Sequence, residues 1–593
     1  MTSPPFDYGR HDEGRGMNYW RHDPALRKEA RRVYPEDEFE WAEDRLDEFG
    51  AVVGDTIADN ADVIDERGPE LSTYDERGNV ANEVYYHPAQ RENERLTYER
   101  GVVADAFRPP PGRDEPLGLV HTLTMQLLLS YVDAGFVCPV SMTAGAALVL
   151  RNHDEDGHLD DYFEGLTSRN RDDRIEGAMF LTEEQGGSDV GANETVAEPV
   201  GDPSETRTYE LTGEKWFCSN IDAQGTLVLA RRAGAPEGTK GLSLFLVPHE
   251  TRDGELNDQL YRRLKDKLGT ISVPTGEVEF RGAEGHLVGE PERGFEYMTT
   301  MLNWERVTNA VGAVGIMGRA LVESKVQAAN REAFGRPIRE YPLMKRDLVE
   351  MAVDYEAALA FSLEAGRWLD RYERDRDDRE AFRLMRTLTP IAKLRTARMA
   401  VENASYAMEI QGGNGYVADF VTHRLLRDAQ VLPIWEGTSN VLSLDLLRTL
   451  EREDAHEALL PLVEGFLADA EHPYLEPLAE TVSEEFASLQ EATLALAAGD
   501  DDYAQHEAKR LADYVFDVVT ASLLLSNAQR ELDEDDDARK AVVAERFVRH
   551  MLTTPSARGI ADRDAPALEH FDAVVRHAPL DPAMLGEPAP ADD

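Results

Sequence analysis

The sequence predicts an α+β protein in which a small β-sheet domain lies between helical domains along the chain. The run from Leu117 to Leu150 is strongly apolar but is interrupted by Gly, Pro and polar residues, which is typical of buried helices and disfavours a membrane span. Between residues 172 and 288, short β-branched and aromatic segments alternate with Gly, Pro and Asp turns, as expected for a sheet. Apolar residues return to helical spacing from Arg306 to Gln327.

The boundaries of the predicted domains follow shifts in composition. The chain of 593 residues has room for about three to four domains. Both ends are rich in Pro and Asp, which is typical of unstructured segments. The predicted parts are a flexible arm (1–34), an N-terminal helical domain (35–171), a middle β-sheet or barrel domain (172–288), a helical bundle (289–452), a helical C-terminal extension (453–578) and a disordered tail (579–593).

Individual elements are predicted from periodicity and turn residues. A helix is expected over Glu36–Phe49, because Pro precedes it and Gly follows it. In the β domain, strands are expected at Ala178–Leu181, Thr206–Leu211, Thr226–Ala230, Leu242–Val247 and Gly276–Phe280. In the C-terminal extension, helices are expected at Leu511–Ala528 and Lys540–Leu552, separated by a solvated acidic loop, Glu531–Asp537.

The charge balance is strongly acidic, with 114 Asp and Glu against 63 Lys and Arg and a formal net charge of −51. Because 42% of the residues are hydrophobic, there is enough apolar surface for a core, so a disordered acidic chain is excluded. Such an excess is typical of extreme halophiles, where salt near 1 M shortens the Debye length to about 3 Å. We interpret the acidity as an adaptation to salt rather than as the mark of a partner.

The compartment is predicted from cysteine usage and from the N-terminal sequence. Cys138 and Cys218 are the two cysteines, so a disulfide framework is excluded and a reducing cytoplasm is expected. The first residues contain no apolar segment of the kind found in signal peptides, and no association with a membrane is expected.

The first candidate functional residue is Glu436, in the stretch Ile434–Asn440. Its carboxylate lies between an apolar, aromatic flank and a Gly-Thr turn, and burial there would disfavour the charged form. Such a carboxylate suits a general base that removes a weakly acidic proton from carbon. The alternative is a helix N-terminus capped by Thr438 or Ser439, with Glu436 packed there incidentally. The seven residues alone leave both interpretations open.

Two stretches of the β domain are candidates for cofactor contacts. A strand that runs into Thr182 and then into Gly-Gly-Ser188-Asp offers hydroxyls and backbone N–H groups, which can hold a flavin edge or a pyrophosphate. An ordinary glycine turn is the favoured interpretation of that tetrapeptide alone. The segment Lys215–Asn220 contains Trp216 and Phe217, which would form either a wall for a flat cofactor or part of the core.

Two further motifs lie in the helical bundle. Arg331 and Phe334, taken as one helical turn apart at a helix end, would clamp a phosphate and an adenine, or else cap the helix with a solvated arginine. Gly412 and Gly413 form a second glycine-rich turn, which is neither a dinucleotide-binding GxGxxG nor a P-loop.

No metal site is predicted. The stretch His153–His158 has ligand-type residues, but it lacks the spaced oxygen ligands and the terminal Glu of a calcium loop, so a hydrated loop is expected. The two cysteines are far apart and form no CxxC pair.

Taken in order, these motifs resemble those of the acyl-CoA dehydrogenase family, from about Pro69 to Arg448. Within the family, the chain looks like the AidB-like subgroup, flavoproteins of the adaptive response to alkylation. The residues that carry this likeness are Pro69–Leu71, Tyr74–Asp75, His87–Pro88, Cys138–Thr143, Thr182–Asp189, Arg263–Gly269 and Ile434–Gly437, together with the extra segments at both ends.

The resemblance implies a non-covalent FAD in a tetramer. The implied cofactor residues are Met179 and Leu181, Thr182 at the flavin ring, Ser188 at the pyrophosphate, Trp216, Phe217 and Cys218 along the isoalloxazine, Arg331, Phe334, Gly412 and Gly413 at the adenine half of a neighbouring subunit's FAD, and Trp435, Thr438 and Asn440 beside the base.

The same resemblance implies α,β-dehydrogenation of an acyl-CoA, with Glu436 as the base, flavin N5 as the hydride acceptor and an electron-transfer flavoprotein as the partner. Three departures from the family pattern stand out. Glu409 replaces a Gln, Tyr341 and Pro342 replace a Gln after the R-x-x-F-G motif, and Glu305 occupies an alternative base position. With Glu436 present, Glu305 is expected to be a supporting or solvated group.

Two competing functions remain open at the level of sequence. The first is an AidB-like flavoprotein that protects DNA from alkylation with little or no acyl-CoA turnover. That role needs a basic face, whereas the C-terminal extension carries acidic runs, and its basic pairs Lys509–Arg510 and Arg539–Lys540 are expected to be solvated. Nucleic-acid binding is therefore disfavoured. The second is a flavin-binding protein without turnover, which the candidate base argues against.

Overall fold

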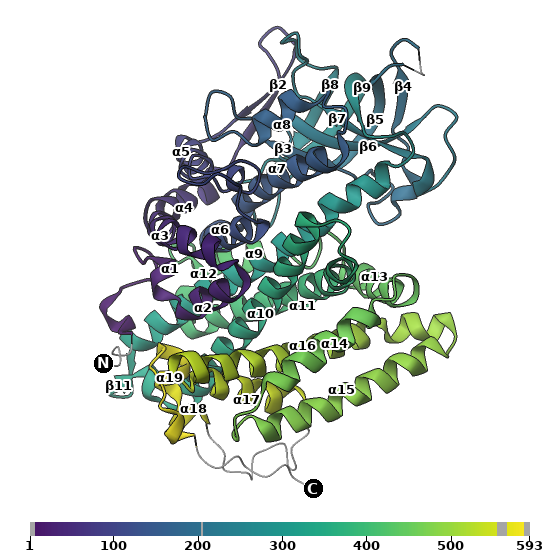
Figure 1. The fold of residues 1–593 in the computed structure, drawn as a ribbon. Coiled ribbons are helices and arrows are strands. Elements are labelled where there is room, and N and C mark those ends of the chain that lie inside the picture. Colours follow the sequence, from purple (N-terminus) through teal and green to yellow (C-terminus); the bar gives the residue numbers. More distant parts are fainter. Residues whose placement is uncertain (1–5, 203–204, 554–565, 586–593) are drawn as a thin grey trace. The chain divides into compact units, whose positions relative to one another are not determined.

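The computed structural model describes residues 6–202, 205–553 and 566–585. The chain divides into two compact units, one formed by Asp55–Thr308 and the other by Met1–Gly54 with Asn309–Asp593 (Figure 1). Helix α9 (Gly294–Asn330) contributes residues to both units.

The unit Asp55–Thr308 contains a seven-stranded sheet in the order β3-β6-β4-β5-β9-β7, with β8 paired to β9 and β6 also paired to β7. The strands are β3 (Gly177–Phe180), β4 (Val196–Pro199), β5 (Thr208–Ser219), β6 (Gly225–Arg232), β7 (Leu242–Val247), β8 (Gln259–Leu264) and β9 (Thr275–Val288). Every residue of β7 is buried, and its sequence is accordingly almost continuously apolar. Strand β5 begins with alternating buried and solvent-facing positions.

Helices cover this sheet and complete the unit. They are α4 (Ala58–Glu66), α5 (Pro88–Tyr98), α6 (Leu119–Ser130), α7 (Ala134–His153) and α8 (Asp160–Leu166). Helix α7 packs directly against β3: a Cβ on Gly177 would lie 2.8 Å from the carbonyl oxygen of Met142, so only glycine permits this approach. The buried apolar cluster between α7 and the sheet is the core of the unit.

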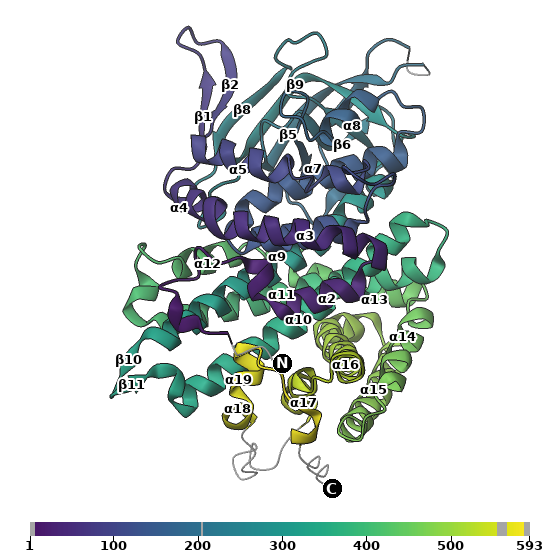
Figure 2. The same cartoon turned by 60° about the vertical axis from the view of Figure 1, so that its left-hand side comes forward.

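The other unit is almost entirely helical. Its elements are α1 (Tyr19–His22), α2 (Pro24–Val33), α3 (Glu36–Val52), the later part of α9, α10 (Pro342–Arg374), α11 (Arg379–Gln411), α12 (Thr422–Ala429) and α13 (Ser439–Arg452). The C-terminal extension adds α14 (His456–Asp469), α15 (Glu476–Ala497), α16 (Asp501–Asp535), α17 (Arg539–Met551), α18 (Pro566–Glu569) and α19 (Phe571–Arg576). Figure 2 shows α14, α15 and α16 side by side.

The predicted fold class is confirmed: helical, β-sheet and helical segments follow one another, and a helical extension ends the chain. Two described helices, α7 and α16, are long and apolar enough to cross a membrane, but 89% and 78% of their apolar windows are buried inside the protein. Burial in the core therefore accounts for their composition.

Several predictions about the ends of the chain are wrong. The predicted flexible arm forms α1 and α2 over residues 6–34 and buries Tyr19 and Trp20, because aromatic side chains outweigh the Gly and Pro content. At the other end, Leu580 is buried and its carbonyl accepts a hydrogen bond from the Ala538 N–H, so residues 579–585 are ordered. Residues 586–593 of the predicted tail lie outside the described residues.

Other corrections concern missed elements. The predicted all-helical segment 35–171 contains a hairpin of β1 (Glu70–Tyr74) and β2 (Val80–Tyr85), and strands β4 and β8 were not predicted. The acidic run is helical rather than a loop, because α16 continues to Asp535. Residues 533–536 are exposed as predicted, but the Glu531 side chain is buried, with its carboxylate 2.8 Å from Lys28 Nζ.

Arg539 and Lys540, predicted as a solvated basic pair, are buried at the start of α17. Both pair with Glu356 of α10: the Arg539 guanidinium bonds its carboxylate, and Lys540 Nζ lies 2.7 Å from Oε2. Burial alone would raise the pKa of Glu356, but these two cations hold it well below its ordinary range. The C-terminal extension is therefore joined to α10 through buried ion pairs. The sequence pattern did not predict these ion pairs.

A second buried carboxylate, Glu364, lies about two helical turns beyond Glu356 on α10. Arg32 Nη1 and Arg367 Nη2 each lie 2.5 Å from its oxygens, and Trp368 Nε1 donates to it at 2.7 Å. Burial opposes ionisation, but Arg32 and Arg367 lower the pKa of Glu364 to about 2. Because the pKa is lower in the folded state, ionisation of Glu364 stabilises the fold above the unfolded pKa near 4.5, and this contribution is lost as the pH falls toward 2.

We predict that Glu364→Gln lowers the free energy of unfolding by about 3–5 kcal/mol at neutral pH, because two arginines lose their buried counter-charge. The difference in the free energy of unfolding between the wild type and Glu364→Gln should become smaller by about 3 kcal/mol as the pH falls from 4.5 to 2. Chemical denaturation at a series of pH values measures both effects. The matched control is Glu402→Gln, an exposed position on α11, which should behave as the wild type. An equal loss in both variants would contradict this assignment.

Candidate functional site

In the unit Asp55–Thr308, the segment after β3 forms a tight loop that presents Thr182 and Ser188. Gly186 has φ +144°, which favours glycine, and a Cβ on Gly187 would lie 2.5 Å from Thr182 Oγ1, so a larger residue there would displace the Thr182 side chain. The backbone N–H of Trp216 donates to the Thr182 carbonyl at 2.9 Å, which ties the loop to β5. Ser188 is exposed and Thr182 is half-buried.

The loop is anchored by the buried carboxylate of Glu183. It accepts hydrogen bonds from Thr195 Oγ1 at 2.6 Å, from the Glu194 N–H at 2.6 Å and from Lys215 Nζ at 2.8 Å. Lys215 is fully buried and also donates to Asn193 Oδ1 at 2.7 Å. Burial alone would raise the pKa of Glu183, but the Lys215 ammonium and the hydrogen bonds lower it. Burial lowers the pKa of Lys215.

The predicted aromatic wall is present in part. Phe217 is 56% exposed and Trp216 is half-buried, and the Lys265 ammonium lies 3.9 Å from the Trp216 ring centroid. Cys218, by contrast, is fully buried in the core of the sheet, and Met179 belongs to the same core. The structure therefore does not bring the side chains of Cys218 and Met179 to the exposed wall, because the backbone of β5 and β3 directs them inward.

In the other unit, the candidate base Glu436 lies between α12 and α13. Its φ of +55° is uncommon for a residue with a side chain, and Gly437 follows with φ +103°. The buried Lys393 of α11 donates to the Gly437 carbonyl at 2.6 Å, and Trp435 Nε1 donates to Asn309 Oδ1. Glu436 is half-buried, and one of its carboxylate oxygens is inaccessible to solvent.

The alternative interpretation of this stretch, a helix N-terminus, is also correct as local structure. Helix α13 begins at Ser439 with Thr438 as its N-cap, although the Thr438 hydroxyl accepts no capping hydrogen bond from the described residues. Thr438 and Asn440 are both exposed. The turn that starts α13 therefore serves to hold Glu436, and the two interpretations are compatible.

The expectation that Arg331 and Phe334 lie one helical turn apart is wrong. Helix α9 ends at Asn330, and both residues belong to a hairpin of β10 (Glu332–Ala333) and β11 (Arg336–Pro337), because Phe334 and Gly335 take positive φ values of 50° and 91° at its turn. Phe334 is 98% exposed. The Tyr341 hydroxyl, at one of the departures from the family pattern, donates to the Ala333 carbonyl at 2.7 Å and holds the hairpin.

Gly412 and Gly413 follow α11 directly, and both have open space where a Cβ would lie. Glu305 belongs to the unit Asp55–Thr308 and is buried, so of the two expected roles the solvated one is wrong and the supporting one remains a prediction. The Ser141 hydroxyl of α7 donates to Glu305 Oε1 at 2.9 Å. Leu181 is half-buried at the end of β3.

Sequence reasoning missed four positioning residues: Glu183, Lys215, Asn309 and Lys393. A lysine flanked by apolar residues in a core helix is a weak signal of buried charge, and Lys393 shows it, whereas Lys215 directly follows Glu214. Nothing local to the sequence signals the partners of Glu183 and Asn309, because these contacts join segments that are distant in the chain.

Comparison with protein families matches three consecutive parts of the chain. Residues 11–173 match the adaptive response protein AidB N-terminal domain, residues 178–283 match the acyl-CoA dehydrogenase middle domain, and residues 292–451 match the acyl-CoA dehydrogenase C-terminal domain. The chain belongs to the acyl-CoA dehydrogenase family. The predicted family and its AidB-like character are thus confirmed.

Three relatives illustrate this membership. Acyl-CoA dehydrogenase family member 11 of Caenorhabditis elegans is 33% identical over 446 residues, which cover 74% of this chain and 71% of that protein. The acyl-CoA dehydrogenase AidB of Escherichia coli is 33% identical over 407 residues, covering 65% of this chain and 70% of that protein. The crystal structure of Caenorhabditis elegans ACDH-11 in complex with C11-CoA is similar with a TM-score of 0.84 at 28% identity and covers 95% of this chain and 96% of that one.

FAD is the cofactor of this member of the acyl-CoA dehydrogenase family. The residues present fit it: a glycine turn with an exposed hydroxyl suits a pyrophosphate, and the exposed ring of Phe217 beside Trp216 suits a flat ring system. The open glycines 412 and 413 permit close approach of a ligand to the backbone.

We predict that Lys215→Met weakens FAD binding by about tenfold or more and lowers the unfolding temperature, because Glu183 then stays buried without its counter-charge. Titration of the flavin-free protein with FAD, followed by fluorescence, measures the first effect. Lys240→Met makes the same change at an exposed position of the same sheet region and should bind FAD as the wild type does. Unchanged FAD affinity in Lys215→Met would show that the ion pair between Lys215 and Glu183 does not position the loop of Thr182 and Ser188 for FAD.

Proposed function

We propose that this chain is an FAD-dependent acyl-CoA dehydrogenase in which Glu436 removes the α-proton of the acyl group. The observation that carries the proposal is the geometry of Glu436: a left-handed backbone conformation, a neighbouring carbonyl bonded to buried Lys393, and one carboxylate oxygen shielded from solvent. A fixed, partly desolvated carboxylate is what abstraction of a proton from carbon requires. Membership of the family and the similarity to a relative in complex with C11-CoA support an acyl-CoA as substrate.

Each residue of the site has a defined part in this proposal. Glu436 takes the proton on its carboxylate, while Lys393 and Trp435 keep its loop from moving. Thr182 and Ser188 bind the cofactor through their hydroxyls and adjoining backbone N–H groups. When bound, FAD supplies the acceptor for the β-hydride. An electron-transfer flavoprotein is the proposed electron acceptor.

The direct test is anaerobic mixing of the flavin-loaded protein with a panel of acyl-CoAs at high salt. We expect at least one acyl-CoA to bleach the oxidised flavin band, and Glu436→Gln to slow the bleaching by about 10²–10⁴-fold, the usual contribution of a general base. Glu451→Gln, an exposed change on α13, should leave the rate unchanged. Bleaching that persists at the wild-type rate in Glu436→Gln would overturn the assignment of the base.

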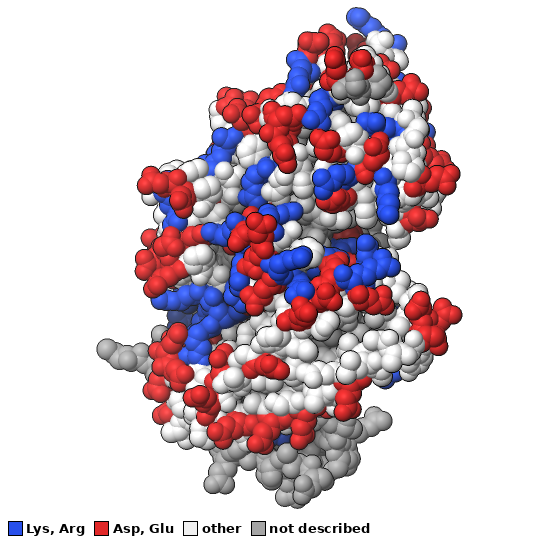
Figure 3. Space-filling model, turned by 45° about the vertical axis from the view of Figure 1, so that its right-hand side comes forward, with Lys and Arg blue, Asp and Glu red and all other residues white. Residues whose placement is uncertain are grey.

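We also propose an AidB-like protective role as the second candidate, because the family model of residues 11–173 and the relative from Escherichia coli both carry that name. The charge argues against DNA binding, since Asp and Glu are spread over the face shown in Figure 3 and the net charge is −51. A flavin that no acyl-CoA reduces, in a protein that retains duplex DNA at physiological salt, would promote this role.

We further propose that the protein acts in the cytoplasm of a halophile, which its acidic composition supports. We also propose that it is a homotetramer, which its family supports. Raising KCl from about 0.1 M to about 1 M should increase the unfolding temperature, because a Debye length that falls from about 10 Å to about 3 Å screens repulsion between acidic side chains. Calorimetry and light scattering at the two salt concentrations measure stability and assembly. A lower unfolding temperature in the higher salt would contradict the proposal.

A further inference from the structure

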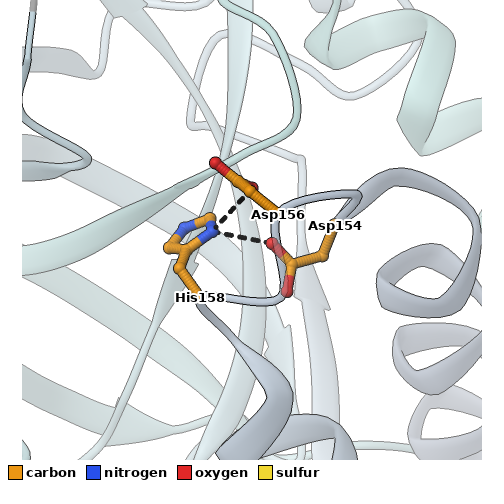
Figure 4. A group of neighbouring side chains, drawn as sticks. All are labelled: Asp154, Asp156 and His158. Atoms are coloured by element: carbon orange, nitrogen blue, oxygen red, sulfur yellow. Dashed lines mark hydrogen bonds and ion pairs between the residues drawn. The ribbon is translucent and has the colours of Figure 1, made fainter.

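The loop between α7 and α8 brings together three side chains of ligand type. The turn that starts at Asp154 closes through a hydrogen bond from the Gly157 N–H to the Asp154 carbonyl at 3.2 Å, and Gly157 takes a φ of +69°. As a result, alternate residues of the loop face one point: Asp154, Asp156 and His158 are directed toward one another (Figure 4). The hydrated loop predicted from the sequence is thus an organised cluster.

The contacts within this cluster leave one buried oxygen without a hydrogen. His158 Nδ1 lies 3.2 Å from Asp156 Oδ1, with which it makes a hydrogen bond, and 2.7 Å from Asp154 Oδ1. Asp154 Oδ1 accepts no hydrogen bond from any described residue, although only 4% of the Asp154 side chain is exposed. One ring N–H cannot serve both carboxylates, and a buried carboxylate oxygen without a donor is costly.

The other oxygen of each carboxylate is already held. Asp154 Oδ2 accepts the Leu159 N–H at 2.9 Å. Asp156 Oδ2 accepts from Arg207 Nη2 at 2.6 Å, and Arg207 also donates to the Gly289 carbonyl at 2.6 Å. These outer partners orient the other oxygen of each carboxylate toward His158 Nδ1, as the outer partners of metal ligands do.

The spacing of the three ligand atoms suits a small cation. Two ligands around a tetrahedral ion with bonds of about 2.1 Å lie about 3.4 Å apart. The two distances from His158 Nδ1, 2.7 Å and 3.2 Å, are shorter by a few tenths of an ångström. All three ligand atoms lie within 4.8 Å of one another. The Asp156 side chain is 50% exposed, which leaves an open side where water can complete the coordination.

We propose that Asp154, Asp156 and His158 bind one divalent transition-metal ion, with Zn²⁺ as the ion that fits best. Imidazole nitrogen together with carboxylate oxygen favours Zn²⁺ over Ca²⁺ and Mg²⁺, which prefer oxygen ligands alone. The ion replaces the proton on Nδ1 and satisfies Asp154 Oδ1. Through Asp156 and Arg207 it fixes the α7–α8 loop to the segment that enters β5. This site is separate from the proposed dehydrogenase chemistry.

The test is titration of chelator-treated, flavin-loaded protein with ZnCl₂ by calorimetry, in about 1 M NaCl to suppress weak binding to the acidic surface. We expect one Zn²⁺ per chain. Asp154→Asn, whose amide oxygen can still accept the Leu159 N–H, and His158→Gln should each weaken binding by at least about tenfold. The matched control is Glu155→Gln, an exposed neighbour in the same loop with the same change of charge, which should bind as the wild type does.

Two outcomes would overturn the proposal: no saturable binding of one Zn²⁺ per chain, or a loss in Glu155→Gln equal to that in Asp154→Asn. Unfolding curves without metal show whether each variant is folded. If Asp154→Asn fails to fold, the Zn²⁺ affinity of His158→Gln is the test. A wild-type Zn²⁺ affinity in His158→Gln would also overturn the proposal. Substitution with Co²⁺ supplies a second readout, because its visible spectrum changes when an imidazole nitrogen enters the coordination shell.

Discussion

Buried charge must be matched by an opposite charge or by hydrogen bonds, and this constraint shapes the candidate functional loops of each unit. In the β-sheet unit, the Lys215 ammonium meets Glu183 and Asn193 and thereby fixes the loop that carries Thr182 and Ser188. In the helical unit, the Lys393 ammonium reaches the Gly437 carbonyl next to the base. In each case the lysine contacts the loop that carries a candidate functional side chain.

The same constraint explains how so acidic a chain folds. The net charge of −51 resides mostly on the surface, whereas buried carboxylates such as Glu356 and Glu364 are surrounded by arginine and lysine. Their pKa values fall below the ordinary range because the cations outweigh the cost of burial. Buried basic residues are therefore reserved for positions that join distant segments, such as Arg539 at the start of the C-terminal extension.

Much of the fold could be predicted because periodicity and turn residues are local signals. Strand β7 has its predicted bounds, Thr438 precedes a helix as the sequence allows, and Gly412–Tyr416 form a turn. The hairpin that carries Phe334 was missed because its positive φ values depend on the turn rather than on residue type. The inward direction of Cys218 and the burial of Lys540 depend on tertiary packing, which no single-sequence pattern records.

The central claim, that Glu436 and not Glu305 is the base, is tested most directly by exchange of the acyl α-hydrogen with solvent deuterium. With the flavin reduced beforehand, hydride transfer is blocked and exchange reports proton abstraction alone. Mass spectrometry of the recovered acyl-CoA should show deuterium at Cα with the wild type and with Glu305→Gln, and exchange about 10²-fold slower or more with Glu436→Gln. Exchange that survives in Glu436→Gln but is lost in Glu305→Gln would contradict the account.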